Sequence, residues 1–343
     1  MNQWQISQAI SSFPNIINDW DRLNKKLFRS HPLLDSRFIQ ALLHHFGNTN
    51  IKLAVYITED KEVQNLLLLQ QRQPGIWGVF LPSQAQIAPI LCSQPQSLPT
   101  LFKRLSPYSL SIELLAQDPE YTFTLHSLDN LEKMHHATTM NITIQGSFES
   151  YWQGRSKNLQ RNIKRYFNRL GKSDISINIE SHTSLGEIEN ALSRYGEMEI
   201  KSWKAKKGTA IHQNNQQGQF YLDLIKSFAK TGQAEILELY LNDVLTASRI
   251  NLLHKNMLII LKTTYDENFS KYSPGRLLLY RLIEREFTLN RINHIEFYTN
   301  ATTDQLSWST GKRSIRHITL YRSIYLQKTF LLIRLLKNNL LRK

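Results

Sequence analysis

The feature that most restricts the fold lies between residues 234 and 287. Here three strand-like segments lead into a loop and a helix. The segments "AEILELYLN", "VLTASRINLLH" and "NMLIILKTTYD" have strand composition, and Asn242-Asp243 is typical of a tight hairpin turn. The next apolar segment, "PGRLLLYRLIEREF", repeats its leucines at helical spacing. The sequence therefore predicts an antiparallel meander whose last strand is followed by a loop and a helix.

The predicted helix begins at Ser273-Pro274-Gly275. Ser273 can cap the helix, and Pro274 suits the first helical position because no N–H is needed there. Gly275 lets a ligand approach the backbone, and Lys271 and Arg276 add positive charge to a helix N-terminus that already attracts phosphate. Such a start is more often only a cap, so the motif alone leaves both a structural role and a phosphate site open.

The rest of the chain predicts an α/β (α+β) protein with two mixed, largely antiparallel sheets flanked by helices. A chain of 343 residues exceeds what one core usually serves, so two domains are expected. Helical periodicity is present over residues 31–47, 148–170, 184–207 and 218–232. Further strands are expected at 51–57, 63–71, 109–117, 134–146, 174–181 and 294–300.

The formal net charge of +14 predicts an anionic partner. Residues 151–172 carry seven Lys or Arg and no acid. This basic helix can be a solvated face, can bind the phosphates of a coenzyme or an anionic acceptor, or can bind nucleic acid. No nucleic-acid recognition motif accompanies it, which makes nucleic acid the least favoured of the three.

Cysteine and histidine usage argues against disulfides and metal. The single cysteine, Cys92, lies in a Pro/Ser/Gln-rich stretch and is not expected to be a nucleophile. The pairs His44-His45 and His135-His136 lack zinc spacing, so no metal is assigned. No stretch reaches the roughly 18–20 apolar residues of a membrane-spanning helix, and the first residues do not resemble a signal peptide, so a cytoplasmic location is expected.

Four stretches, in order and at matching spacing, resemble one branch of the GNAT acyltransferases. They are "YWQGRSKNLQRNIKRYFNRL", "EIKSWKAKKGTAI", "LKTTYDENFSKYSPGRLL" and "NATTDQLSWSTGKR". The branch is the cellulose-biosynthesis acetyltransferases of the CelD/BcsL type, which have a BioF-like acetyltransferase domain and are related in fold to the Fem-type transferases. The likeness covers roughly residues 148 to 316, with a looser match at "SHPLLDSRFIQALLHHFG".

This resemblance implies two GNAT-like domains, at residues 1–140 and 141–324, with a basic tail helix at 325–343. The second domain would hold acetyl-CoA or another acyl-CoA as co-substrate. The residues implied in coenzyme binding are Ser270, Lys271, Tyr272, Ser273, Pro274, Gly275, Arg276, Leu277 and Asn300. One departure is the last strand, "IEFYTNA", where Glu296 stands in place of the family's aspartate.

Proton transfer in such a reaction points to four candidates. Glu199 belongs to a Glu-x-x-Ser-Trp-Lys match with the family, and can be a base or a structural ion-pair partner of a lysine. Asp266 and Glu267 end the strand beside the phosphate loop, where they can take a proton or simply cap the turn. Tyr265 can protonate the leaving thiolate or can be a packing residue.

Residues matching the family's acceptor side are Trp203, Lys204, Trp308 and Arg313. Trp308 and Arg313 can line the acceptor pocket or pack the sheet edge. The resulting hypothesis is an acyl-CoA-dependent N-acyltransferase acting directly on an amine of a small-molecule, glycan or lipid-linked acceptor of envelope or exopolysaccharide metabolism. The alternatives are a Fem-like transferase using aminoacyl-tRNA and a non-catalytic GNAT-fold binding module.

The tail, "YLQKTFLLIRLLKNNLLRK", has an apolar centre and basic flanks. It can lie on an anionic membrane surface, at the inner face of the membrane, or dock on the protein itself.

Overall fold

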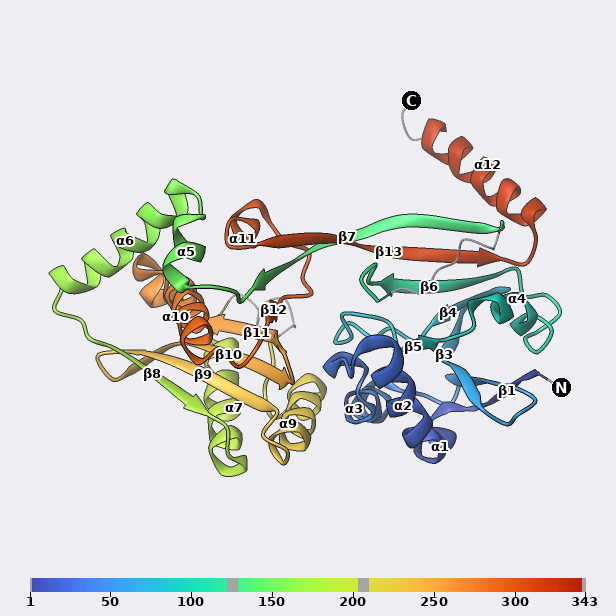
Figure 1. Ribbon diagram of the computed structural model, residues 1–343, viewed down its shortest axis with the longest axis horizontal. Coiled ribbons are helices and arrows are strands. Elements are labelled where there is room, and N and C mark those ends of the chain that lie inside the picture. Colours follow the sequence, from blue (N-terminus) through green and yellow to red (C-terminus); the bar gives the residue numbers. More distant parts are fainter. Residues whose placement is uncertain (1, 122–128, 203–209, 341–343) are drawn as a thin grey trace. The chain divides into compact units, whose positions relative to one another are not determined.

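The structure is a computed structural model that describes residues 2–121, 129–202 and 210–340. The chain forms two compact units, Met1–Thr138 with Arg313–Lys343, and Thr139–Lys312 (Figure 1). Two strands, β7 (Leu131–Thr143) and β13 (Gly311–Tyr321), carry the chain from one unit to the other. The mixed α/β class with mostly antiparallel pairing is as predicted. The domain limits of 1–140, 141–324 and 325–343 stay a prediction.

The first unit contains one sheet, helices that pack against it, and the C-terminal helix α12. Its strands run in the spatial order β1-β2-β3-β4-β6-β13, and β5 pairs with β3. The strands are β1 (Gln3–Gln8), β2 (Lys52–Ile57), β3 (Val63–Gln73), β4 (Ile76–Val79), β5 (Ile90–Cys92) and β6 (Ser111–Gln117). The helices are α1 (Ala9–Ser12), α2 (Ile17–Phe28), α3 (Ser36–Phe46), α4 (Leu98–Leu101) and α12 (Ile324–Leu340).

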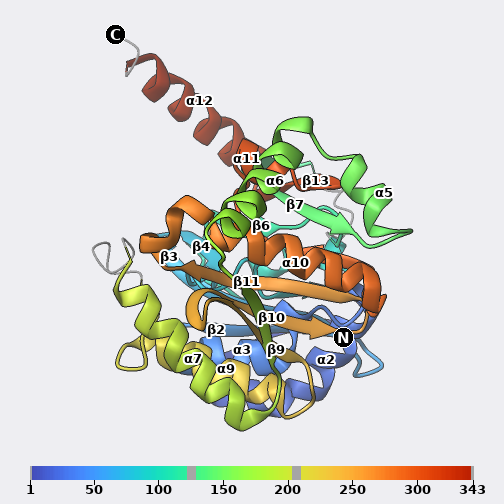
Figure 2. The same cartoon turned by 90° about the vertical axis from the view of Figure 1, so that its left-hand side faces the viewer.

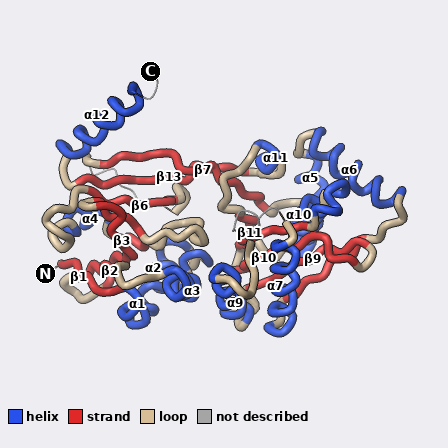
Figure 3. The backbone as a smooth tube through the Cα atoms, turned by 180° about the vertical axis from the view of Figure 1, so that it is seen from behind, coloured by secondary structure: helices blue, strands red, loops and turns tan. Residues whose placement is uncertain are grey.

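The second unit contains the predicted meander. Its strands lie in the order β7-β12-β11-β10-β9-β8, drawn in red in Figure 3. They are β8 (Ile177–His182), β9 (Ala234–Leu241), β10 (Val244–His254), β11 (Met257–Tyr265) and β12 (His294–Glu296). β9, β10 and β11 pair antiparallel, and Asn242 and Asp243 adopt positive φ in their turn, which confirms the predicted hairpin.

Helices cover both faces of this sheet (Figure 2). They are α5 (Phe148–Gln153), α6 (Lys157–Lys172), α7 (Leu185–Ile200), α9 (Gln216–Ala229), α10 (Pro274–Leu289) and α11 (Thr303–Leu306), with a 3-10 turn η4 (Glu267–Tyr272). One hydrophobic core joins α10, α6 and the sheet, with Leu278, Ile163 and Leu239 as buried members from each of the three. α7 and α9 pack together on the other face, as Figure 1 also shows.

Three sequence expectations are wrong in detail. The single helix predicted over 148–170 is two helices, because the chain turns at Gly154 and the Ser156 hydroxyl caps a new start by accepting from Leu159 N–H. The strand predicted at 294–300 ends at Glu296. The strand β13 was not expected at all, because its apolar residues alternate with charged ones over a segment interpreted as a sheet edge.

The helix predicted over 184–207 begins as expected but ends at Ile200, and residues 203–209 lie outside the described part of the chain. Within the described residues, no helix is both long and apolar enough to cross a bilayer.

Candidate active site

The loop between β11 and α10 has a defined backbone path. Asp266 accepts a hydrogen bond from Asn268 N–H (2.9 Å) and donates its own N–H to the Thr246 carbonyl (2.9 Å), which starts the turn η4. At its end Ser273 adopts φ +52°, in the left-handed region that non-glycine residues enter only under constraint. The expected side-chain cap is wrong, because Ser273 makes no capping bond through its hydroxyl. The chain instead turns sharply into α10.

The first turn of α10 uses most of its backbone N–H groups within the turn itself. Pro274 has no N–H, and the N–H groups of Arg276 and Leu277 donate to the Ser273 carbonyl (2.9 and 3.1 Å). Among the described residues no partner is recorded for the Gly275 N–H. A Cβ on Gly275 would lie 3.6 Å from Cδ1 of Tyr265, an ordinary contact. A glycine is therefore not needed here to avoid a steric clash. Its missing side chain leaves the backbone of the helix start accessible.

A buried arginine donates a hydrogen bond to the backbone of the same helix start. Arg249, on β10, is 6 % exposed, and its Nη2 donates to the Gly275 carbonyl (3.0 Å). Burial lowers its pKa to about 10. Its Nε has no hydrogen-bond partner in the structure, and no acidic partner is recorded for it within the described residues. The sequence analysis missed this residue, although a lone cation within the apolar strand "VLTASRINLLH" was a usable signal.

The basic helix α6 lies against the loop. Nη1 of Arg276 donates to the Tyr166 hydroxyl (3.1 Å), and Nη1 of Arg169 donates to the Lys271 carbonyl (2.8 Å). The pKa of Tyr166 is lowered, because burial, which raises it, is outweighed by hydrogen bonds with Ser273, Arg165 and Arg276. The loop is thus surrounded by cationic side chains on two helices.

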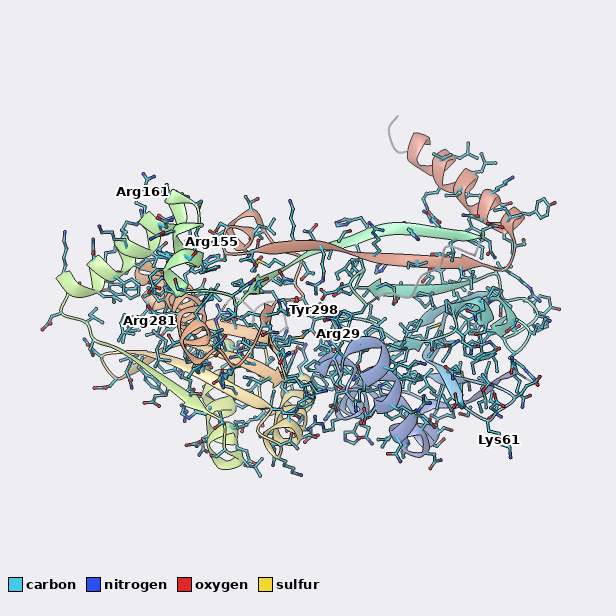
Figure 4. All side chains as sticks on the ribbon, in the orientation of Figure 1. Arg29, Lys61, Arg155, Arg161, Arg281 and Tyr298 are labelled. Carbon is cyan, nitrogen blue, oxygen red and sulfur yellow. The ribbon has the colours of Figure 1, made fainter. Side chains whose placement is uncertain are left out.

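Other cations extend this positive surface of the second unit. Figure 4 labels Arg155 and Arg161, which precede and lie on α6, and Arg281 on α10. Arg281 pairs with Glu284 (2.6 Å), and Arg155 donates to the Ser309 carbonyl. For Arg161, no acidic partner is recorded in the described ranges. Arg276, in the first turn of α10, also pairs with Asp304 (2.8 Å), so acids compensate part of the positive charge around the loop.

A pocket of about 620 Å³ opens between the end of α7 and the end of β11. Tyr265, Asp266 and Glu267, three of the predicted catalytic residues, line it together. The other lining residues are Asn190, Ser193, Arg194, Glu197, Met198, Lys201, Ser202, Leu245 and Asn268. Tyr265 lines this pocket, and its ring also lies beside Gly275, since Cδ1 is 3.6 Å from where a Cβ on that glycine would be placed.

Acidic side chains outnumber basic ones in the lining of the pocket. Nη2 of Arg194 is bonded to the fully buried carboxylate of Glu238 (2.6 Å), which also accepts from the Tyr240 hydroxyl (2.9 Å). That pairing neutralises one of the pocket's two cations, whereas Glu197 and Glu267 are exposed acids. A pocket of this kind favours a cationic or amine-bearing ligand.

Glu199 does not line the pocket. It is 1 % exposed, and its carboxylate accepts from the Tyr195 hydroxyl (2.9 Å) and from Ile211 N–H (2.6 Å). Burial, with the nearby Glu199 charge second, raises the pKa of Tyr195. These contacts tie α7 to the segment before α9, and they favour the structural role for Glu199.

The structure describes two of the four predicted acceptor residues, Trp308 and Arg313. Trp203 and Lys204 fall outside the described residues. Trp308 is 2 % exposed in the core of the second unit, its ring centroid 5.9 Å from that of Trp152. Arg313 belongs to the first unit, where its guanidinium donates to both carboxylate oxygens of Asp118 (Nε to Oδ1 at 2.8 Å, Nη2 to Oδ2 at 2.7 Å).

Three further residues named from the sequence have defined surroundings. Asn300 is exposed in the segment after β12. Glu296, at the end of β12, is 2 % exposed and accepts from Nδ2 of Asn141 (3.3 Å). Cys92 is 1 % exposed, and burial raises the pKa of its thiol, which disfavours the reactive thiolate.

Comparison with known proteins assigns the region around this site. Residues 157–304 match the family model of an acetyltransferase (GNAT) domain. The second unit carries a GNAT domain. The GNAT part of the sequence resemblance is thereby confirmed, and the CelD/BcsL type stays a prediction. No curated protein matches the chain at a significant level.

Solved structures resemble nearly the whole chain in fold. FemX aligns with a TM-score of 0.59 at 10% identity, over 92% of this chain and 98% of that one. The C-terminal domain of a protein from Agrobacterium fabrum, described as a lysylphosphatidylglycerol synthetase, aligns at 0.56 and 8% identity, over 93% and 96%. A Bacteroides thetaiotaomicron protein of unknown function aligns at 0.53 and 9%, over 94% and 99%. At these identities the likeness shows a shared fold and nothing more.

Proposed function

We propose that the protein is an acyl-CoA-dependent N-acyltransferase, with acetyl-CoA as the first candidate donor. The observation that supports this is the position of Tyr265, which lines an acid-containing pocket and lies beside the start of α10, the proposed site for the coenzyme phosphates. A donor bound at the first and an amine bound in the second would meet at the end of β11. The GNAT domain match supports the acyl-CoA side of the proposal.

The donor site would consist of the loop and first turn at residues 270–277, with Asn300 following β12. The N–H of Gly275 and the positive end of α10 would hold the pyrophosphate, since such groups bind anions without a specific side chain. Arg249, which bonds to the Gly275 carbonyl, would add positive charge close to the bound pyrophosphate.

The pantetheine arm of the donor would lie along the edge of β11. β11 pairs in parallel with β12 over Met257 to Ile259, opposite His294 to Glu296, and β12 ends there while β11 continues to Tyr265. The backbone groups beyond Ile259 on that edge would bond the amides of an extended arm, because buried backbone groups need partners.

The reaction would be direct transfer. The neutral acceptor amine attacks the thioester carbonyl, a C–N bond forms, the C–S bond breaks, and CoA leaves as a thiolate. We assign removal of the ammonium proton to Asp266 or Glu267 and protonation of the thiolate to Tyr265, because all three line the pocket. Glu199 would hold α7 in position and would not contact the substrate.

An acceptor screen tests the function. The protein is incubated with acetyl-CoA and a panel of amino sugars, aminolipids and peptides, and released thiol is measured. Acceptor-dependent release of CoA, with one N-acetylated product, is the expected result. An envelope or exopolysaccharide-related amine is the acceptor class that we favour, at the cytoplasmic side of the membrane.

One alternative keeps a specific observation in its favour. The cations of α6 without acidic partners among the described residues, such as Arg161, suit a polyanion, as a Fem-like transferase using aminoacyl-tRNA would require. Protection of tRNA from nuclease, together with absence of acetyl-CoA binding, would favour this alternative. Salt-sensitive binding of a polymer without any transfer would favour a non-catalytic module.

A further inference from the structure

The C-terminal helix α12 exposes an unusual amount of apolar surface. Leu332 is 58% exposed, Leu335 61% and Leu336 55%. The other large apolar side chains exposed on this helix are Ile324, Tyr325, Leu331 and Ile333. Soluble proteins seldom leave a contiguous patch of this kind uncovered unless it contacts something.

One face of α12 is fixed to its own unit. Nε2 of Gln327 donates to the Leu131 carbonyl (2.7 Å), and the Phe330 ring lies 5.6 Å from that of Tyr321. One turn further on, Arg334 pairs with Glu132. Positions 327, 330 and 334 follow helical spacing, so they form a single attached face.

The opposite face is the exposed one. Tyr325, Lys328, Leu332, Leu335 and Leu336 are spaced at three and four residues and lie about half a turn from the attached face. We call these five residues the outer stripe. Figures 1 and 3 show α12 leaving the end of β13 and pointing away from the sheet of its unit.

Charge indicates what covers the outer stripe. Residues 325–343 contain five Lys or Arg and no acid. A second exposed aromatic, Tyr108 (81% exposed), belongs to a loop that Arg322 holds near the helix start by donating to the Ser109 carbonyl (3.3 Å). Apolar residues with basic neighbours and tyrosines at the edge are typical of helices that lie on anionic bilayers.

We infer that α12 is a peripheral membrane anchor, whose outer stripe enters the surface of a bilayer containing anionic lipid. A second copy of the chain fits less well, because two such tails would bring like charges together. Among the described residues, α12 included, no helix meets the criteria of a membrane span. The inference rests on α12 and its unit, and holds whichever acceptor the enzyme uses.

Vesicle co-sedimentation with the full chain tests it. Vesicles of phosphatidylcholine alone are compared with vesicles containing about one third phosphatidylglycerol, at low and high salt. The test variant is the pair Leu332→Asn and Leu336→Asn. The matched control is the pair Ile10→Asn and Leu289→Asn, which removes two exposed apolar residues elsewhere. Circular dichroism checks that both variants fold.

The wild type and the control pair should bind anionic vesicles at least about tenfold more tightly than neutral ones, and the outer-stripe pair should lose about tenfold or more. High salt should weaken binding. Equal binding by both pairs, or no sedimentation with anionic vesicles, would overturn the inference. So would a wild-type dimer that the outer-stripe pair converts to a monomer while vesicle binding stays unchanged, since a second copy would then cover α12.

Discussion

The ring of Tyr265 lies 3.6 Å from the point where a Cβ on Gly275 would be placed. The ring of the last residue of the meander therefore lies beside the first turn of α10. The pocket that Asp266 and Glu267 line is thereby close to Gly275, whose N–H is the proposed phosphate donor. The proposed chemistry depends on that adjacency, and the predictions below test its parts.

Removing the proposed base should slow turnover without weakening donor binding. We expect Asp266→Asn or Glu267→Gln to lower kcat by about 10²–10⁴-fold, the usual contribution of a general base. The Kd of acetyl-CoA should change little, because both carboxylates line the pocket rather than α10. Steady-state kinetics and calorimetry measure the two quantities. Glu149→Gln, an exposed change on α5, is the control; wild-type turnover in both pocket variants would refute the assignment.

Glu199 should matter for stability more than for chemistry. Glu199→Gln replaces a buried carboxylate that accepts hydrogen bonds from Ile211 N–H and from the Tyr195 hydroxyl. A glutamine amide has only one acceptor oxygen, so one of these two donors would lose its partner or face the amide NH₂ group. We expect a loss of about 1–3 kcal/mol in the free energy of unfolding. Urea unfolding measures this. A variant with unchanged stability and strongly reduced kcat would instead assign Glu199 to catalysis.

Arg249 should support donor binding. Arg249→Met removes a buried charge that lacks an acidic partner among the described residues, so the free protein should keep or gain stability. The affinity for acetyl-CoA should fall by about tenfold or more, because a cation beneath the α10 start is lost. Thermal melts with and without acetyl-CoA separate the effects. An unaltered ligand-induced shift in Tm would contradict this role.

His317 should make the first unit sensitive to acid. Its Nδ1 accepts from Ala116 N–H (3.0 Å), and its ring stacks 4.0 Å from that of His136. Burial, then His136 and Arg72, lowers its pKa from the usual 6.5 to about 4. As pH falls, His317 is therefore protonated in the unfolded chain at a higher pH than in the folded protein. The free energy of unfolding should decrease as pH falls from about 6.5 to about 4.

The size of this loss should be modest, because His317 is only half buried. We expect roughly 1–2 kcal/mol after solvent screening. Urea unfolding at several pH values should show a flatter profile for His317→Gln than for the wild type. Parallel profiles would mean that other groups cause the acid sensitivity.

Local patterns predicted the meander, the loop and α10, because each has a clear period and a clear turn signal. The left-handed Ser273 was not predictable, since its conformation follows from packing of the loop against Tyr166 on α6. The pocket joins α7 to the end of β11, segments far apart in sequence, so no local pattern could reveal it. Arg249 stood out in its strand only as a lone cation, and its role depends on a partner in another element, the Gly275 carbonyl.

The most direct test of the account is acetyl-CoA binding by calorimetry to the wild type, Gly275→Glu and Gly186→Glu. Gly275→Glu would place a carboxylate beside Tyr265 at the donor site, whereas Gly186 has open space on α7 and carries the same added charge. The account predicts binding by the wild type and by the Gly186 variant, and none by a folded Gly275 variant. Equal binding by all three would contradict a donor site at the start of α10, and no binding by the wild type would contradict acyl-CoA dependence.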